Sequence, residues 1–436
     1  MASNCVENRG PASRREVFAW CMYDFANSSY TTVIITVAFS VYFTTVVAGG
    51  EDGNGERLWG WGYALSMLVI GLMAPLLGAV ADHGGFKKRF LLFFTSLCIL
   101  ATSALFFVGP GDIVLGLMLL ALSNIGFNGG MHFYNSFLID VSDRSNIGRI
   151  SGYGWALGYV GGLLCLILVY PLIKGGLVDA NLASYRLSFP LTALFFLVAS
   201  IPTFLFLRER STVRANLTAG HHIRGGLRRM IETFHEIRKF RELTKYFFGY
   251  LLYTDGINTV AVFSAIFANK VLGFTPGEIV MYFVVVNVSA ALGALAFGPI
   301  TDRLGARGAI SITLVILTGV MAGVYMVETK TGFYIVGLVA GAAMGSNQAA
   351  SRALLGLFTP HGKNAEFFGF FATVGKFSAV LGPIIYGEVT AATGNQRYAI
   401  LTIGAFFLVG LLLLQFVDEK KGKEAAEGFE ETHPLK

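Results

Sequence analysis

Two short loops decide how this chain folds: "GAVADHGGFKK" at residues 78–88 and "GPITDRLGAR" at residues 298–307. Both contain the pattern Gly-x-x-x-Asp-x-x-Gly-x-[Lys/Arg], and Asp302 follows Asp82 by 220 residues. Each loop directly follows a long apolar run. A pattern that recurs at such a distance predicts a chain of two similar halves.

Two further pairs of segments match in the same order. "YDFANS" at 23–28 resembles "YTDGINT" at 253–259, since both contain Asp-x-x-Asn-[Ser/Thr]. "GYGWALGY" at 152–159 resembles "GFFATVGK" at 369–376. Each match alone is weak, but three in one order predict parallel repeats, which are typical of a large class of membrane transporters.

The composition is that of a protein embedded in a membrane. Of the 436 residues, 54% are hydrophobic and only 14% are charged, whereas soluble proteins carry about 25% charged residues. Many apolar runs reach 20 residues, which is enough to cross about 30 Å of hydrocarbon as a helix. We expect an all-α polytopic protein of twelve transmembrane helices in two six-helix lobes. The expected spans are 17–47, 60–82, 89–109, 113–140, 149–173, 187–207, 246–269, 277–301, 308–328, 332–358, 364–391 and 397–417.

The spans divide the chain into five parts: an N-terminus (1–16), an N-terminal lobe (17–207), a basic linker (208–245), a C-terminal lobe (246–417) and a tail (418–436). Within the linker, "LRRMIETFHEI" places apolar residues on one helical face and arginines on the other. This pattern predicts an amphipathic helix that lies on the membrane surface.

The basic residues give the orientation. The two termini, the linker and every second loop hold 25 of the 33 Lys and Arg residues, and the other loops hold six. Positively charged loops stay in the cytoplasm, so we expect both termini there, in a plasma (inner) membrane. The same distribution accounts for the net charge of +6, so we expect the lipid bilayer and no nucleic acid as a partner. We expect a monomer.

Family resemblance sharpens this interpretation. The loops after spans two and eight resemble the signature of the major facilitator superfamily. Four segments resemble the autophagy-related vacuolar amino-acid effluxer family, whose prokaryotic members are often called the unknown major facilitator family. These segments are "WCMYDFANSSY" (20–30), "NIGRISGYGWALGYVGG" (146–162), "GSNQAASRALLGLFTP" (345–360) and "EFFGFFATVGKFSAVLGP" (366–383). The resemblance covers about residues 17–417 and implies efflux of amino acids or similar metabolites.

Three charged residues fall inside apolar runs at about one depth: Asp24, Asp255 and Lys376. Each lies nine or ten residues from a charged residue at the expected cytoplasmic boundary, or about 13–15 Å along a helix. Such charges are costly in hydrocarbon and are usually functional or paired. We expect a substrate and proton pathway, with Lys376 the best candidate to balance Asp24. The alternative is an ion pair that only fixes how the lobes pack.

Four other polar residues belong to the same expected pathway. Asn27 and Asn258 lie one helical turn after the two aspartates, and each could instead hydrogen-bond a neighbouring helix. Gln348 and Arg352 lie near the inner end of span ten. Arg352 either binds substrate or closes a gate, or it only reaches toward the interface.

The two signature loops predict a conformational latch. A loop carboxylate can accept hydrogen bonds from the first amides of a neighbouring helix, and the resemblance implies that these loops hold the lobes together when the outside is open. Asp140 either joins Arg144 and Arg149 in this inner gate or is a solvated helix end. The candidate latch residues are Gly78, Asp82, Lys87, Gly298, Asp302, Arg303, Arg307, Asp140 and Arg149.

Several chemistries have no counterpart in the sequence. There is no Gly-x-x-x-x-Gly-Lys-[Ser/Thr] phosphate loop, no His-Glu-x-x-His motif and no Cys/His group with metal-ligand spacing. We therefore expect no catalytic residues, no metal and no cofactor, with H+ as the candidate coupling ion. The best-supported function is secondary transport of small zwitterions. The alternatives are transport of a lysophospholipid or other lipid-like substrate, and a non-transporting receptor on a transporter fold.

Overall fold

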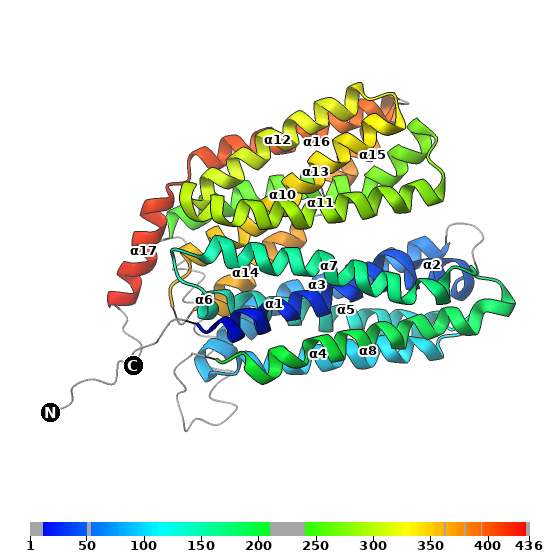
Figure 1. Cartoon of the computed structure of the whole chain (residues 1–436), viewed down its shortest axis with the longest axis horizontal. Helices are drawn as coiled ribbons and strands as arrows, with labels where there is room; N and C mark the ends of the chain where they lie inside the picture. The colour runs from blue at the N-terminus through cyan, green and yellow to red at the C-terminus, as the bar shows by residue number, and fades with distance from the viewer. Residues whose placement is uncertain are drawn as a thin grey trace.

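The structure is a computed structural model that describes residues 12–49, 54–209, 240–361, 363–378, 381–393 and 395–432. These residues form helices and connecting loops, with no strand among them. Figure 1 shows two stacked lobes whose long helices run in roughly the same direction. We call the end of the bundle where α1 begins the terminal end and the opposite one the far end. The prediction of an all-α, two-lobe fold is confirmed.

The first six spans make the N-terminal lobe. They are α1 (Arg14–Ser29) continued by η1 (Tyr30–Val37), α2 (Phe39–Tyr42) and η2 (Phe43–Val47); α3 (Asn54–Gly84); α4 (Lys87–Ala104) with η3 (Leu105–Phe107); α5 (Ile113–Ser136) with α6 (Leu138–Val141); α7 (Ile147–Ile173); and α8 (Leu182–Phe206), which follows the short η4 (Asp179–Asn181).

The second six make the C-terminal lobe. They are α10 (Arg241–Leu272), α11 (Pro276–Leu304), α12 (Ala306–Met326), α13 (Lys330–Phe358), the pair α14 (Asn364–Phe377) and α15 (Leu381–Thr393), and α16 (Gln396–Gln415). A further helix, α17 (Glu419–Thr432), lies at the terminal end (Figure 1).

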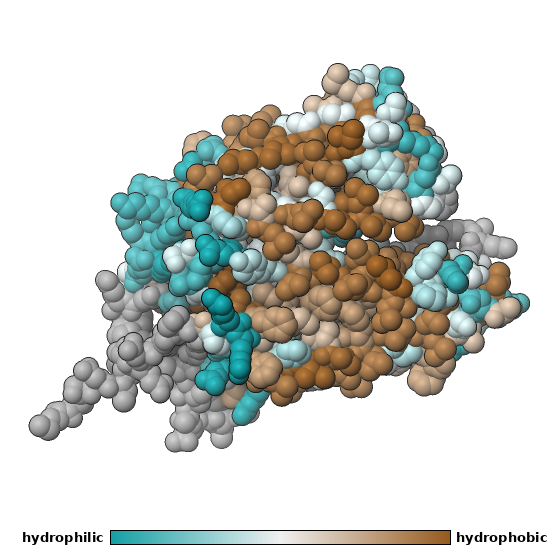
Figure 2. Space-filling model, in the orientation of Figure 1, coloured by the Kyte–Doolittle hydropathy of each residue, from teal (hydrophilic) through white to brown (hydrophobic). Residues whose placement is uncertain are grey.

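The surface matches a membrane environment. Figure 2 shows a band of hydrophobic residues that crosses both lobes between two more polar ends. Ten segments of the described chain are long and apolar enough to cross a membrane. The remaining two spans, α10 and α13, pack beside α16 and α11. Both carry a buried charged residue, Asp255 in α10 and Arg352 in α13, which lowers their hydropathy.

Three local features differ from the expected spans. Span one widens into π-helical turns at η1 and η2, where β-branched residues are frequent and a regular helix was expected. The linker is shorter than 208–245, because α10 already begins at Arg241. The tail expected at 418–436 is mostly the helix α17. The predicted amphipathic linker helix lies outside the described residues.

Each lobe closes on itself through one glutamate, and we call these two contacts the lobe clasps. Glu209, just after α8, accepts hydrogen bonds from the backbone N–H groups of Lys87 at 2.9 Å and Lys88 at 3.1 Å. Glu419, just after α16, accepts from the N–H of Arg307 at 2.9 Å. Both carboxylates therefore sit at the N-terminus of the third helix of their lobe, where the helix dipole favours a negative charge.

Candidate functional site

The lobes meet where α7 packs on α11 and where α14 packs on α3. The two signature glycines allow this close approach. A Cβ atom on Gly298 would lie 2.9 Å from the Cα of Arg149, and a Cβ on Gly78 would collide with the carbonyl oxygen of Ala365 in the other lobe. The later glycine of each loop, Gly85 or Gly305, has a positive φ of 66° or 83°, which glycine adopts at little cost.

Each signature aspartate caps a helix of the other lobe. The Asp302 carboxylate accepts hydrogen bonds from the N–H of Gly148 at 2.7 Å and of Arg149 at 3.2 Å, at the start of α7. Asp82 accepts from the N–H of Glu366 at 3.0 Å, in the first turn of α14. The Arg149 Nε lies 3.7 Å from Asp302. We call these two contacts the terminal latch.

The other candidate latch residues have different surroundings from the two aspartates. Asp140 is buried and forms a 2.6 Å ion pair with Lys87 of its own lobe. It also accepts a hydrogen bond from the Asn364 side chain of the other lobe at 3.5 Å, so it contacts that lobe without Arg144, which pairs with Glu427 of α17 at 2.8 Å. The Arg307 guanidinium donates to Gln415 within the C-terminal lobe, and Arg303 is exposed.

A buried ion pair joins the lobes on the far-end side of the terminal latch. The Arg352 Nη1 on α13 lies 3.3 Å from the Asp24 Oδ2 on α1, and both side chains are at most 4% exposed. The same guanidinium donates to Asn135 at 3.1 Å and to the Ser151 hydroxyl at 2.9 Å. Arg352 therefore does not reach out to the interface, and it partly neutralises Asp24 across the two lobes.

Aromatic rings enclose this ion pair. The Arg352 guanidinium lies 4.9 Å from the ring centre of Trp20, 5.6 Å from that of Tyr134 and 5.4 Å from that of Trp155. Ring faces attract cations, most strongly where water is excluded. The Tyr134 hydroxyl also donates to the Asp24 Oδ2 at 3.1 Å. The pair is thus held by packing as well as by charge.

Two further contacts between the lobes join residues at equivalent positions of the sequence repeat. The Lys376 Nζ on α14 donates to the Asn128 Oδ1 on α5, and the Tyr159 hydroxyl on α7 donates to the Gln348 Oε1 on α13 at 2.6 Å. Gln348 follows Asn128 by 220 residues and Lys376 follows Tyr159 by 217. The two contacts are therefore equivalent under the pseudo-symmetry of the lobes.

Asp255 stands in a different environment from Asp24. It is fully buried in α10, and its Oδ2 accepts from the N–H of Gly382 at 2.9 Å, in the first turn of α15. Its Oδ1 has no hydrogen-bond partner among the described residues. The expected pairing of Lys376 with Asp24 is not present. Asn27 is buried, and Asn258 is half-buried.

Sequence reasoning missed several of these groups. Asn128, Tyr134, Trp155 and Tyr159 were not selected, although Asn128 and Tyr159 lie at the repeat positions of Gln348 and Lys376. The offset of about 220 residues could have found both. No spacing rule indicates the two aromatic residues, because they reach Arg352 only through the packing of the lobes.

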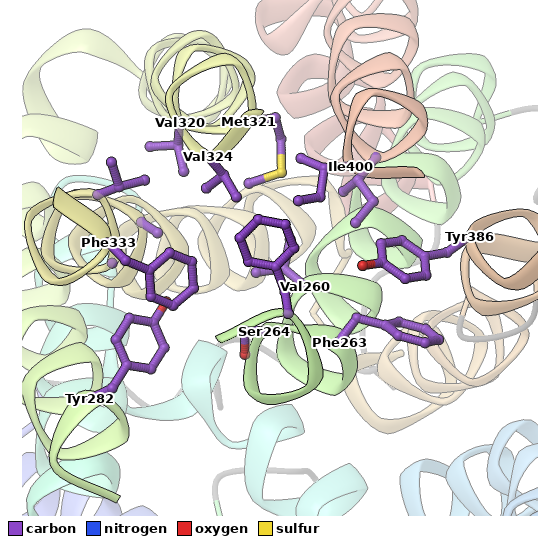
Figure 3. Close-up of a pocket in the computed structure, with 15 residues that line it drawn as sticks. Val260, Phe263, Ser264, Tyr282, Val320, Met321, Val324, Phe333, Tyr386 and Ile400 are labelled. Atoms are coloured by element: carbon purple, nitrogen blue, oxygen red, sulfur yellow. The ribbon is translucent and has the colours of Figure 1, made fainter. Parts of the chain in front are cut away.

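An apolar pocket inside the C-terminal lobe is separate from this polar centre. Figure 3 shows Phe263, Phe333, Met321 and Tyr386 around it. Its volume is about 40 Å³, and one water needs about 10–15 Å³ on the same measure. The pocket is therefore too small for a metabolite.

The two-lobe fold of the described helices is the fold of the major facilitator type. By structure, the chain is similar to the human organic anion transporter MFSD10 (TM-score 0.71, 14% identity, covering 92% of this chain and 99% of that one). It is also similar to FucP in the outward conformation (TM-score 0.71, 13% identity, covering 92% and 98%).

The chain belongs to the family described as "Vacuole effluxer Atg22 like", whose model matches residues 61–143 and 139–427. It is 28% identical to an uncharacterized MFS-type transporter, YxiO, of Bacillus subtilis, over 94% of this chain and 96% of that protein. It is 23% identical to autophagy-related protein 22 of Yarrowia lipolytica, over 84% and 76%. The relatives are transporters and not enzymes, so the expectation of a non-enzymatic transport protein is confirmed.

Proposed function

We propose that the chain is a secondary transporter that works by alternating access and exports amino acids or related zwitterions. Two observations carry this proposal: the buried Asp24–Arg352 pair between the lobes, and Lys376, which contacts Asn128 across the lobes and has no carboxylate partner among the described residues. A charge held without a counter-charge inside a membrane protein usually marks a substrate or ion pathway. The family name supports efflux.

The hydrogen bonds and ion pairs between the described parts of the two lobes join them toward one end of the bundle, which supports alternating access. Among the described residues, the hydrogen bonds and ion pairs between the lobes lie from the terminal end to the level of Lys376 and Gly71. Lys376 is twelve residues into α14, about 18 Å along the helix. This arrangement corresponds to a state that is closed at the terminal end, with the terminal latch formed.

The substrate would lie between the lobes at this level. The Lys376 ammonium is the group for a substrate carboxylate. The Asp255 Oδ1, which has no hydrogen-bond partner in the part of the chain that the structure describes, is the group for a substrate ammonium. Asp24 becomes available only if Arg352 releases it. A proton on either aspartate would remove its charge, so H+ is the proposed coupling ion.

The terminal end is proposed to face the cytoplasm. It holds most of the Lys and Arg residues that flank the spans, as the positive-inside rule requires. With a plasma membrane location, substrate leaves the cell when the far end is open. The protein is proposed to act as a monomer.

Counterflow in proteoliposomes tests the proposal. Vesicles preloaded with an unlabelled amino acid mixture should accumulate labelled amino acid, and empty vesicles should not. Uptake of a labelled lysophospholipid in place of amino acids would establish the lipid-like alternative. Binding without any counterflow would establish the receptor alternative.

The terminal latch gives a conformational prediction. Asp302→Asn should populate states with the terminal end open by about tenfold or more, because a hydrogen bond to a charged group contributes about 1.5–3 kcal/mol. Spin labels at the exposed positions Arg89 and Leu304, one on each lobe, should report a longer distance. Asp179→Asn, in an exposed far-end turn, is the matched control. If the distances in Asp302→Asn are unchanged, Asp302 does not act as a latch.

A further inference from the structure

A groove opens on the surface of the bundle at the terminal end, beside the seam between the lobes. It has a volume of about 660 Å³, within the range of about 300–1,000 Å³ typical of ligand sites. Residues from α1 and α7 form most of it, and Leu295 of α11 adds a wall from the other lobe. The lining is Ala12, Arg14, Val17, Phe18, Cys21, Asn146, Arg149, Ile150, Tyr153, Leu157 and Leu295.

The mouth of the groove is basic. Arg14 begins α1 and Arg149 lies in the first turn of α7, and both side chains are exposed. No acidic residue is among the described residues that line the groove. Two carboxylates close in sequence or space to these arginines have other partners: Glu16 accepts from the backbone N–H of Ser13 at 2.8 Å, and Asp302 caps α7 besides lying 3.7 Å from the Arg149 Nε. The mouth therefore favours an anion.

The walls away from the mouth are apolar and open to the outside of the bundle. Phe18 is 55% exposed and Leu295 is 43% exposed, in the part of the surface that a bilayer would cover. An acyl chain can lie on such a wall by van der Waals packing, since lipid tails are as apolar as the leucine and phenylalanine side chains there. A soluble anion such as phosphate would gain nothing from it.

We propose that this groove binds an anionic glycerophospholipid from the leaflet at the terminal end. The phosphate lies between Arg14 and Arg149, and an acyl chain runs over Phe18 and Leu295. Basic pockets between transmembrane helices on the cytoplasmic side are typical sites for anionic headgroups. The proposal rests on the proposed orientation only in naming the leaflet as cytoplasmic.

The site is tied to the state of the transporter. Its wall at Leu295 belongs to one lobe and its arginines to the other, and Arg149 also lies 3.7 Å from Asp302 across the seam. When the terminal end opens, α11 leaves α7 and the groove loses that wall. A lipid that binds the closed arrangement better must favour it, so lipid composition regulates the transport cycle.

Native mass spectrometry of the purified full-length chain tests the binding. Phosphatidylglycerol should bind more tightly than phosphatidylcholine of the same chain length. Arg14→Gln should weaken phosphatidylglycerol binding about fivefold, since one basic residue near a membrane contributes about 1 kcal/mol. Arg14→Lys should retain it. Leu295→Trp, which fills the groove and keeps its charge, should also reduce binding.

Arg89→Gln is the matched control, because Arg89 is an exposed arginine at the same end and outside the groove. It should bind lipid as the unmodified chain does. Equal losses in Arg14→Gln and Arg89→Gln, or equal binding of the two lipids, would overturn the proposal. Competition by millimolar inorganic phosphate would show an anion pocket instead of a lipid site. Binding in detergent requires no transport, so its failure leaves the proposed transport function untouched.

Discussion

Arg352→Gln is expected to lower the free energy of unfolding by about 3–5 kcal/mol, because it leaves the buried Asp24 carboxylate without its counter-charge. Transport should be abolished as well. Asn135 and Ser151, which both receive hydrogen bonds from Arg352, lose their partner in the same variant. Thermal unfolding and proteoliposome counterflow on the same preparation measure the two effects.

The double variant Asp24→Asn/Arg352→Gln separates stability from transport. It removes both charges, so most of the lost stability should return, because no unpaired charge remains. Transport should stay absent, since neither group can then exchange partners during the cycle. A stable double variant that transports at the original rate would show that the pair only fixes how the lobes pack.

Lys376→Met is expected to weaken substrate binding by roughly tenfold to 150-fold while leaving thermal unfolding nearly unchanged. The ammonium has an amide partner, Asn128, and no carboxylate partner among the described residues. Its loss therefore leaves no buried carboxylate unpaired. A charge-assisted contact of about 1.5–3 kcal/mol corresponds to roughly a tenfold to 150-fold loss of affinity. Isothermal titration with the substrate found in counterflow measures this loss.

Lys330→Met is the matched control for this substitution. Lys330 forms a 2.7 Å pair with Glu278 within the C-terminal lobe, and 41% of its side chain is exposed. Exposed pairs of this kind contribute about 0–1 kcal/mol, so affinity should stay the same. Equal affinities in the Lys376 and Lys330 variants would exclude Lys376 from the substrate site.

The fold was predictable from the sequence because membrane helices are set by local rules. Twenty-residue apolar runs, two signature loops and the repeat gave the two lobes. Asp82 and Asp302 accept hydrogen bonds from helix N-termini of the other lobe, the contact expected for them. A carboxylate in the last turn of one helix and a glycine with positive φ three residues later constrain this connection strongly. The π-helical turns of span one, which contain several β-branched residues, were not predicted.

The polar centre was only partly predictable. Depth along each helix placed Asp24, Asp255 and Lys376 at one level, but depth does not fix rotation about the helix axis or the reach of a side chain. Arg352 starts closer to the terminal end, and its long side chain brings the guanidinium to Asp24. The sequence therefore identified charged groups without identifying which of them meet.

The lobe clasps have a consequence for how the protein is made. Glu209 completes the N-terminal lobe and Glu419 the C-terminal lobe. The carboxylate of each clasp therefore directly follows the last transmembrane helix of the lobe that it closes. The first lobe can thus be finished in the membrane before the second is synthesised, and the two can be produced as separate polypeptides that assemble through α7–α11 and α3–α14.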